Sequence, residues 1–168
     1  MRFPADIDSL AQEALDLYAR QNKRIVTAES CTGGLLAAAL TSIAGSSKVF
    51  ERGFVSYSNE SKVDLLGVLP ETLKRFGAVS AEVAEAMAQG ALEYSLADVA
   101  LSVTGIAGPE GGTPQKPVGL VYFGLAARDG TIFHVQSFFK NERADVRRAA
   151  VIEGLKILIS YMHPEHKE

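Results

Sequence analysis

The sequence has 168 residues, of which 47% are hydrophobic and 22% are charged, a balance typical of a globular domain with a sizeable core. Its formal net charge of −3 at pH 7 gives no basic face of the kind that nucleic-acid-binding proteins carry. One cysteine excludes an internal disulfide, and no apolar run is long enough to span a bilayer. The opening MRFPADIDSL has neither the basic flank nor the apolar core of a signal peptide. We therefore expect one domain over residues 1–168, a cytoplasmic location, and no nucleic-acid or membrane partner.

The first third of the chain predicts a helix, a strand and a second helix. Apolar residues between Asp6 and Gln21 recur at helical spacing, which predicts an amphipathic helix. The short β-branched segment 24–28 predicts a strand. The alanine-rich segment after it predicts a helix that begins near Gly33 and ends before Gly45.

The middle of the chain predicts a second strand and three helices. Segment 49–58 has strand composition and stops at the turn formers Ser58 and Asn59. Capping and turn residues then delimit three helical segments, which are residues 59–67, 70–77 and 81–97.

The last third predicts a strand, a long loop, a hairpin and a final helix. Residues 98–105 have the composition of a buried strand, and the glycine- and proline-rich loop 105–119 follows it. A loop of this length in a compact domain usually carries function. Residues 120–139 predict a hairpin that turns at Asp-Gly, and residues 142–162 predict an amphipathic helix. Strands that alternate with helices and end in a hairpin predict an α/β fold class, a layered α/β/α fold with a mixed β-sheet.

The stretch TAESCTGGLL, residues 27–36, joins the first strand to the second helix with more hydroxyl and thiol groups than a connection needs. Such a join presents unpaired amide N–H groups and the positive end of the helix dipole. Both attract anions and developing oxyanions. Ser30 and Cys31 lie where that field acts, so the join is a candidate site for a nucleophile.

The base for such a nucleophile is not expected to be a histidine. His134 lies inside a predicted strand, and His163 and His166 lie in a polar tail, which also argues against a metal site. Lysine and tyrosine remain, because either can accept a proton when burial or nearby positive charge lowers its pKa. Tyr57 and Lys62 lie at the end of the second strand and the start of the next helix. Since neighbouring strands deliver their loops to one crevice, the loops after the first three strands are expected to share a site.

Each of these residues also has a purely structural interpretation. Ser30 or Thr32 can be a helix cap, Cys31 a small packed side chain, and Lys62 a solvated lysine on a helix. Two other functions therefore stay open. One is a nucleotide-binding module without turnover, and the other is a cysteine hydrolase that uses Cys31 and is sensitive to thiol alkylation.

Four blocks occur in order along the chain, and together they are more specific than any one alone: TAESCTGG, GSSKVFERGFVSYSNESK, GAVSAEVA and SVTGIAGPEGGTPQKPVG. With these blocks the sequence resembles the CinA C-terminal domain family. Within that family it resembles the stand-alone bacterial nicotinamide-nucleotide amidases, over nearly its whole length.

The resemblance implies a hydrolase without metal or cofactor that converts nicotinamide mononucleotide and water to nicotinate mononucleotide and ammonia. It implies Ser30 as the nucleophile, with Lys62 and Tyr57 as proton-transfer partners. In this mechanism turn amides stabilise the oxyanion, while loop amides and an arginine of the last helix hold the phosphate. The expected substrate-binding residues are Thr32, Gly33, Gly34, Asn59, Thr104, Gly105, Gly108, Arg143 and Arg147. A homo-oligomer is expected as well.

Overall fold

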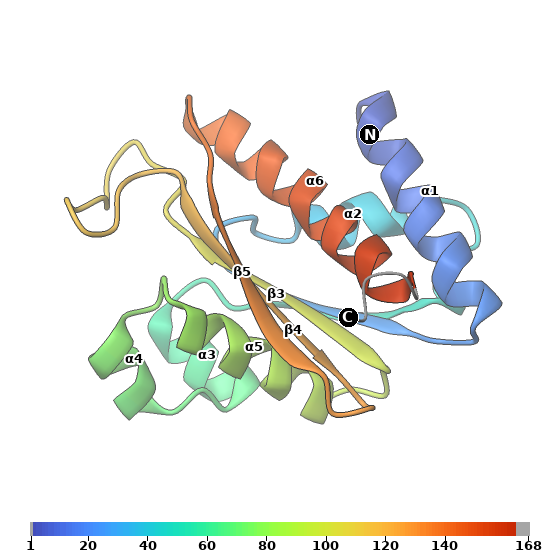
Figure 1. Cartoon of the computed structure of the whole chain (residues 1–168), viewed down its shortest axis with the longest axis horizontal. Helices are drawn as coiled ribbons and strands as arrows, with labels where there is room; N and C mark the ends of the chain where they lie inside the picture. Colours follow the sequence, from blue (N-terminus) through green and yellow to red (C-terminus); the bar gives the residue numbers. More distant parts are fainter. Residues whose placement is uncertain (1, 164–168) are drawn as a thin grey trace.

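The computed structural model describes residues 2–163, which form a five-stranded mixed sheet between two layers of helices (Figure 1). The strands are β1 (Ile25–Glu29), β2 (Phe50–Val55), β3 (Val99–Gly105), β4 (Leu120–Ala127) and β5 (Ile132–Phe138). The α-helices are α1 (Ala5–Arg20), α2 (Leu35–Thr41), α3 (Asn59–Leu66), α4 (Pro70–Phe76), α5 (Ala81–Glu93) and α6 (Arg143–Met162). The predicted layered α/β/α fold with a mixed sheet is confirmed.

The strand order in the sheet is β2-β1-β3-β4-β5. β1 lies between β2 and β3 and is parallel to both, whereas β3, β4 and β5 follow one another in antiparallel pairs. β1 and β3 are buried along nearly their whole length, as expected for central strands that helices cover on both faces. Because β1, β2 and β3 run in the same direction, their carboxyl ends meet at one edge of the sheet.

Helices α1, α2 and α6 cover one face of the sheet, and α3, α4 and α5 lie on the other (Figure 1). The core on the first face includes the buried side chains of Tyr18 and Leu155, and the core on the second includes Met87. α3 packs closely on α5 because Gly90 has no side chain: a Cβ there would lie 1.8 Å from the carbonyl oxygen of Leu66. This contact positions α3, the helix that carries Lys62.

Most predicted elements are present, with small shifts at their ends. α2 begins at Leu35, just after the two glycines, and α5 ends at Glu93 rather than at residue 97. A 3-10 helix at Ser46–Lys48 was not predicted. Within residues 2–163, no helix is long and apolar enough to cross a membrane.

Candidate active site

The carboxyl ends of β1, β2 and β3 surround a cavity of about 250 Å³. The loops after these strands line it, together with the starts of α3 and α6. The lining residues are Ser30, Cys31, Tyr57, Asn59, Lys62, Ala78, Val79, Thr104, Gly105, Ile106, Ala107, Gly108, Glu110, Gly111 and Arg143. The structure thus brings the three loops that were expected to share a site to one cavity.

Ser30 and Lys62 are in direct contact in this cavity. Lys62 Nζ lies 3.0 Å from Ser30 Oγ. Ser30 immediately follows β1, and its amide donates a 2.9 Å hydrogen bond to the carbonyl of Val103 on β3, so the sheet fixes its backbone. Lys62 lies in the first turn of α3, whose N-terminus the Ser58 hydroxyl caps. Two ordered elements therefore hold the hydroxyl and the amine within hydrogen-bond distance.

The amine of Lys62 is buried and pairs with no carboxylate among the described residues. The residue is 1% exposed, and Nζ donates to the carbonyls of Ser56 at 3.0 Å and Tyr57 at 3.2 Å. Burial lowers the pKa of Lys62 below its ordinary value of 10.5, because low-dielectric surroundings disfavour the ammonium. The neutral amine that this favours is the form able to accept a proton from a serine hydroxyl.

Glu29 is a buried carboxylate that the sequence interpretation did not single out. It is the last residue of β1 and is 1% exposed. Its two oxygens accept hydrogen bonds from the amides of Leu36 at 2.8 Å and Ala37 at 3.0 Å, in the first turn of α2. The carboxylate thus satisfies two helix-terminal amides and meets the positive end of the helix dipole. The signal in the sequence was a charged residue at the end of an otherwise uncharged strand.

Residues 30–34 form a tight turn between β1 and α2. Gly33 and Gly34 have φ angles of 58° and 97°, a region that residues with side chains rarely adopt. The Gly33 amide donates to the Ser30 carbonyl at 3.0 Å, so it is already used within the turn. The amides of Cys31, Thr32 and Gly34 donate to no acceptor on another residue within residues 2–163. These amides are the ones left for an anion.

Tyr57 meets the site with two different groups. Its backbone carbonyl accepts from Lys62 and lies 3.4 Å from Ser30 Oγ. Tyr57 is 60% exposed, and its phenol oxygen accepts a 3.2 Å hydrogen bond from Arg143. Arg143 also donates to the carbonyl of Gly108 at 2.9 Å, so it joins the loop after β2 to the glycine-rich loop. The phenol therefore lies with Arg143 rather than with the amine of Lys62.

Cys31 also lines the cavity, but its thiol is poorly suited to nucleophilic attack. The residue is buried, and burial raises the pKa of its thiol to about 11. The thiol is therefore protonated at neutral pH, and no histidine within residues 2–163 lines this cavity. Both observations argue against the cysteine hydrolase alternative.

Four residues expected to bind substrate lie outside the cavity lining: Thr32, Gly33, Gly34 and Arg147. Arg147 donates to the carbonyls of Cys31 at 3.1 Å and Thr32 at 3.2 Å. In this structure it therefore holds the turn that follows Ser30.

The remaining residues expected to bind substrate line the cavity together with Arg143: Asn59, Thr104, Gly105 and Gly108. Thr104 is buried at the end of β3, where its hydroxyl donates to the carbonyl of Ala78 at 2.8 Å. A Cβ on Gly105 would lie 2.9 Å from a backbone oxygen of β4, so glycine lets the end of β3 pass close to its neighbour. Asn59 begins α3, and Gly108 belongs to the glycine-rich loop.

The two histidines among the described residues lie away from this cavity. His134 is on β5 and contacts Glu85 at 2.7 Å, and His163 follows α6. His166 lies outside the described residues. Among residues 2–163, no group of three or more histidine, cysteine, aspartate or glutamate side chains is placed to hold a metal ion.

Sequence reasoning missed the residues that contribute backbone groups or apolar walls, such as Ser56, Ala78 and Ile106. A carbonyl that accepts from Lys62 leaves no trace in residue type. Glu110 was quoted only as part of the glycine-rich loop, and it lines the cavity.

These observations define an α/β protein with a serine–lysine pair in a small polar cavity at the carboxyl edge of its sheet. The model of the CinA C-terminal domain matches residues 7–162, and the chain belongs to the CinA C-terminal domain family. The solved structure of competence/damage inducible protein CihA from Agrobacterium tumefaciens is similar, with a TM-score of 0.94 and 48% identity. That match covers 97% of this chain and 99% of the other.

Two curated relatives differ in length. The chain is 52% identical over 132 residues to the nicotinamide-nucleotide amidohydrolase PncC of Enterobacter agglomerans. That match covers 79% of this chain and 80% of the relative. The chain is 49% identical over 167 residues to the CinA-like protein of Endomicrobium trichonymphae. This second match covers 98% of this chain but 38% of the relative. The chain thus spans less than two fifths of several relatives that it matches.

Proposed function

We propose that this chain is a nicotinamide-nucleotide amidase that hydrolyses the carboxamide of nicotinamide mononucleotide to a carboxylate and ammonia. The observation that carries the proposal is the 3.0 Å contact between Ser30 Oγ and the buried amine of Lys62. The 52% identity to a protein named as a nicotinamide-nucleotide amidohydrolase supports the substrate class.

The first half of the proposed reaction forms an acyl-enzyme. The Lys62 amine takes the hydroxyl proton as Ser30 Oγ attacks the carboxamide carbon, and the C=O electron pair moves to the oxygen. The tetrahedral intermediate then collapses: the C–N bond breaks, Lys62 returns the proton to the leaving nitrogen, and ammonia departs. In the second half, Lys62 removes a proton from water, which attacks the ester carbon, and Ser30 leaves with that proton.

Backbone amides are the proposed stabilisers of the negative oxygen. The amide of Cys31 is the best candidate, since it follows the nucleophile directly, donates to no acceptor on another residue within residues 2–163, and belongs to a residue that lines the cavity. The amide of Thr32 comes next, although Thr32 lies outside the cavity lining. The Gly33 amide is a weaker candidate because it already donates to Ser30.

The phosphate of the substrate is proposed to lie at the mouth of the cavity, near Arg143 and the glycine-rich loop. Arg143 carries the guanidinium that lines the cavity, and its present acceptors are the neutral oxygens of Tyr57 and Gly108. A phosphate is a stronger acceptor for a guanidinium than either. Arg147 is proposed to hold the turn after Ser30 rather than to touch the phosphate, because it contacts two carbonyls of that turn.

The test is ammonia release from nicotinamide mononucleotide by the purified chain, with Ser30→Ala and Cys31→Ala as a matched pair. We expect release by the wild type, none above background by folded Ser30→Ala, and most of the activity in Cys31→Ala. Ligand-dependent thermal stabilisation without ammonia would instead indicate the binding module. Loss of turnover in Cys31→Ala with retention in Ser30→Ala would transfer the reaction to the thiol.

A further inference from the structure

The cavity at Ser30 carries one carboxylate among the described residues that line it, that of Glu110. Its permanent cation is the guanidinium of Arg143, since burial favours the neutral form of Lys62. Glu110 and Arg143 form no ion pair with each other or with any other side chain within residues 2–163. The cavity therefore presents one negative and one positive group, and neither is neutralised by an opposite charge of the described chain.

The glycine-rich loop holds Glu110 at this cavity through close backbone packing. A Cβ on Gly108 would lie 2.5 Å from a side-chain carbon of Val118, and one on Gly112 would lie 2.8 Å from the Val118 amide nitrogen. The glycines that flank Glu110 therefore let the loop lie directly against Val118. Gly108 has a second contact, because its carbonyl accepts a 2.9 Å hydrogen bond from Arg143. The backbone around Glu110 is thus attached both to Val118 and to the start of α6.

The proposed substrate carries a matching pair of charges. Its pyridine ring is positive at the nitrogen that joins the ribose, and the phosphate at the other end of the ribose is negative. When the carboxamide lies at Ser30 and the phosphate at Arg143, the cationic nitrogen lies between them. Glu110 is close in the chain to Gly108, which Arg143 contacts. A carboxylate there repels the phosphate, so it favours binding only if it also meets the cation.

We infer that Glu110 is a specificity-determining residue that selects the cationic pyridine ring, by placing its carboxylate near the ring nitrogen of the bound nucleotide. This inference rests on the proposed function, because it takes the nicotinamide ring to be the group bound at Ser30. The ligand that such a site rejects is the reduced mononucleotide. That molecule keeps the carboxamide, the ribose and the phosphate, but its dihydropyridine ring has no charge. Selection between the two forms is a difference of affinities that one carboxylate can supply.

The expected size of this effect follows from the position of Glu110, which is exposed. Water screens a charge pair at the mouth of a cavity, so one such contact changes a dissociation constant roughly threefold to tenfold. Salt screens the pair further, because the Debye length is about 8 Å at physiological ionic strength. The contribution of Glu110 should therefore shrink as salt is added, whereas a contact with a neutral ribose hydroxyl should depend far less on salt.

The test is ligand binding to folded Ser30→Ala, which separates recognition from turnover. Titration calorimetry gives the dissociation constants of nicotinamide mononucleotide and of its reduced form, with and without the further substitution Glu110→Gln. Glutamine keeps a hydrogen-bonding oxygen and removes the charge. We expect Glu110→Gln to weaken binding of the oxidised nucleotide roughly threefold to tenfold, and to change binding of the reduced nucleotide by less than about twofold. The loss should diminish at high salt.

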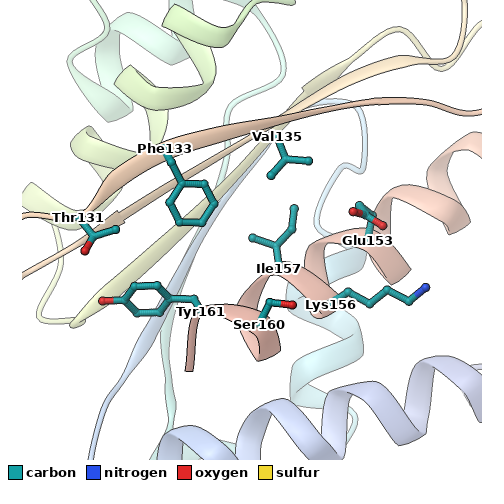
Figure 2. A pocket seen from close by; sticks show the side chains of 8 residues that line it. All are labelled: Thr131, Phe133, Val135, Glu153, Lys156, Ile157, Ser160 and Tyr161. Carbon is teal, nitrogen blue, oxygen red and sulfur yellow. The ribbon is translucent and has the colours of Figure 1, made fainter. Parts of the chain in front are cut away.

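Glu153→Gln is the matched control. Glu153 is another carboxylate without an ion pair within residues 2–163, and Figure 2 shows it on α6 beside the groove between that helix and β5. It lies about 15 Å from Arg143 along the axis of this helix. The substitution removes the same charge from the chain as Glu110→Gln does. It should therefore leave the preference for the oxidised ring unchanged.

Several outcomes would overturn the inference. Equal weakening of both nucleotides by Glu110→Gln would assign the carboxylate to the ribose, and no weakening of either would remove it from the site. A loss that does not diminish with salt would exclude a charge contact. If Ser30→Ala fails to fold, the KM of the oxidised nucleotide and the inhibition constant of the reduced one give the same comparison in the otherwise wild-type chain.

Failure of the proposed function is distinguishable from failure of this inference. A wild-type chain that binds the oxidised nucleotide through Glu110 but releases no ammonia would refute the amidase and leave the selection of the cationic ring standing. Ammonia release with an unchanged preference in Glu110→Gln would overturn the inference alone. A wild-type chain that neither binds the oxidised nucleotide nor releases ammonia would overturn both.

Discussion

The amine of Lys62 has three oxygen neighbours among the described residues: the hydroxyl of Ser30 and the carbonyls of Ser56 and Tyr57. A neutral amine has two N–H donors and one lone pair. The two carbonyls can take both donors, which leaves the lone pair for the hydroxyl hydrogen of Ser30. The protonated amine has three donors and no lone pair, so it cannot act as the base.

Lys62→Arg tests whether that lone pair matters. Arginine keeps the positive charge but does not release its proton in a protein, so we expect a loss of roughly 10²-fold or more in kcat, the scale of a positioned general base. Lys62→Met should lose as much. The measurement is kcat for ammonia release, with circular dichroism to show that both variants fold. Folded Lys62→Arg with more than about a tenth of wild-type kcat would point to an electrostatic role instead.

The pH profile of the wild type follows from the same lowered pKa. The neutral amine is the active form, so kcat/KM should rise with pH and reach a plateau. Because burial lowers the pKa of Lys62, the midpoint of that rise should lie below 10.5. A profile that falls over this range would mean that the ammonium is the working form.

At the scale of a single element, Glu29 stabilises the N-terminus of helix α2. This helix has seven residues and no side-chain cap at its N-cap residue, Gly34. Glu29 supplies the missing acceptors from the preceding strand, through the amides of Leu36 and Ala37. The turn that carries Ser30 is thereby fixed at both ends, by β1 and by this carboxylate.

Glu29→Gln should disturb the site through that turn. The amide side chain keeps one acceptor and turns an NH2 group toward a backbone N–H, which leaves a buried donor unsatisfied at a cost of about 1–3 kcal/mol. We expect a larger fall in kcat than rise in KM, because the nucleophile is displaced while the mouth of the cavity is unchanged. Asp98→Ala is the control, since Asp98 accepts the amide of Arg24 at the opposite ends of β1 and β3. It should lose stability and keep kcat.

The sequence predicted the helices and strands more completely than it predicted the geometry of the candidate site. The hairpin, the capped helices and the strand-turn-helix at residues 27–36 follow from periodicity and from residues whose conformation is restricted, such as Gly34 and Ser58. The end of α5 could not be predicted in this way, because Tyr94 and the residues after it give no strong signal that a helix ends there. Lys62 was named from its residue type, yet its burial depends on α3 packing against α5 at Gly90, a tertiary contact that local sequence does not encode.

At the scale of the whole molecule, buried ionisable groups make the stability depend on pH. Unfolded Lys62 titrates near its ordinary value of 10.5, whereas burial lowers the pKa of the folded residue. Between these two values the unfolded chain binds more protons, so the free energy of unfolding rises with pH in that window. Cys31 and Tyr18 act in the opposite direction. Burial raises their pKa values above 9.0 and 10.0, so the folded chain keeps protons that the unfolded chain loses, and stability falls as pH rises above those values.

Lys62→Met isolates the contribution of the lysine. Methionine removes the titrating group and leaves Cys31 and Tyr18 in place, so the difference in unfolding free energy between variant and wild type cancels their effect to first order. We expect the wild type to gain stability relative to Lys62→Met as pH rises toward 10.5, because the unfolded lysine keeps its proton up to that value while the folded amine has already lost it. Urea unfolding at a series of pH values measures this difference. The absolute stability of the variant also falls because the Ser56 and Tyr57 carbonyls lose their hydrogen-bond donor. The test therefore uses the slope of the stability difference against pH, which this loss does not change. A slope of zero over this range would place the folded pKa of Lys62 at its ordinary value and remove the physical basis for its action as a base.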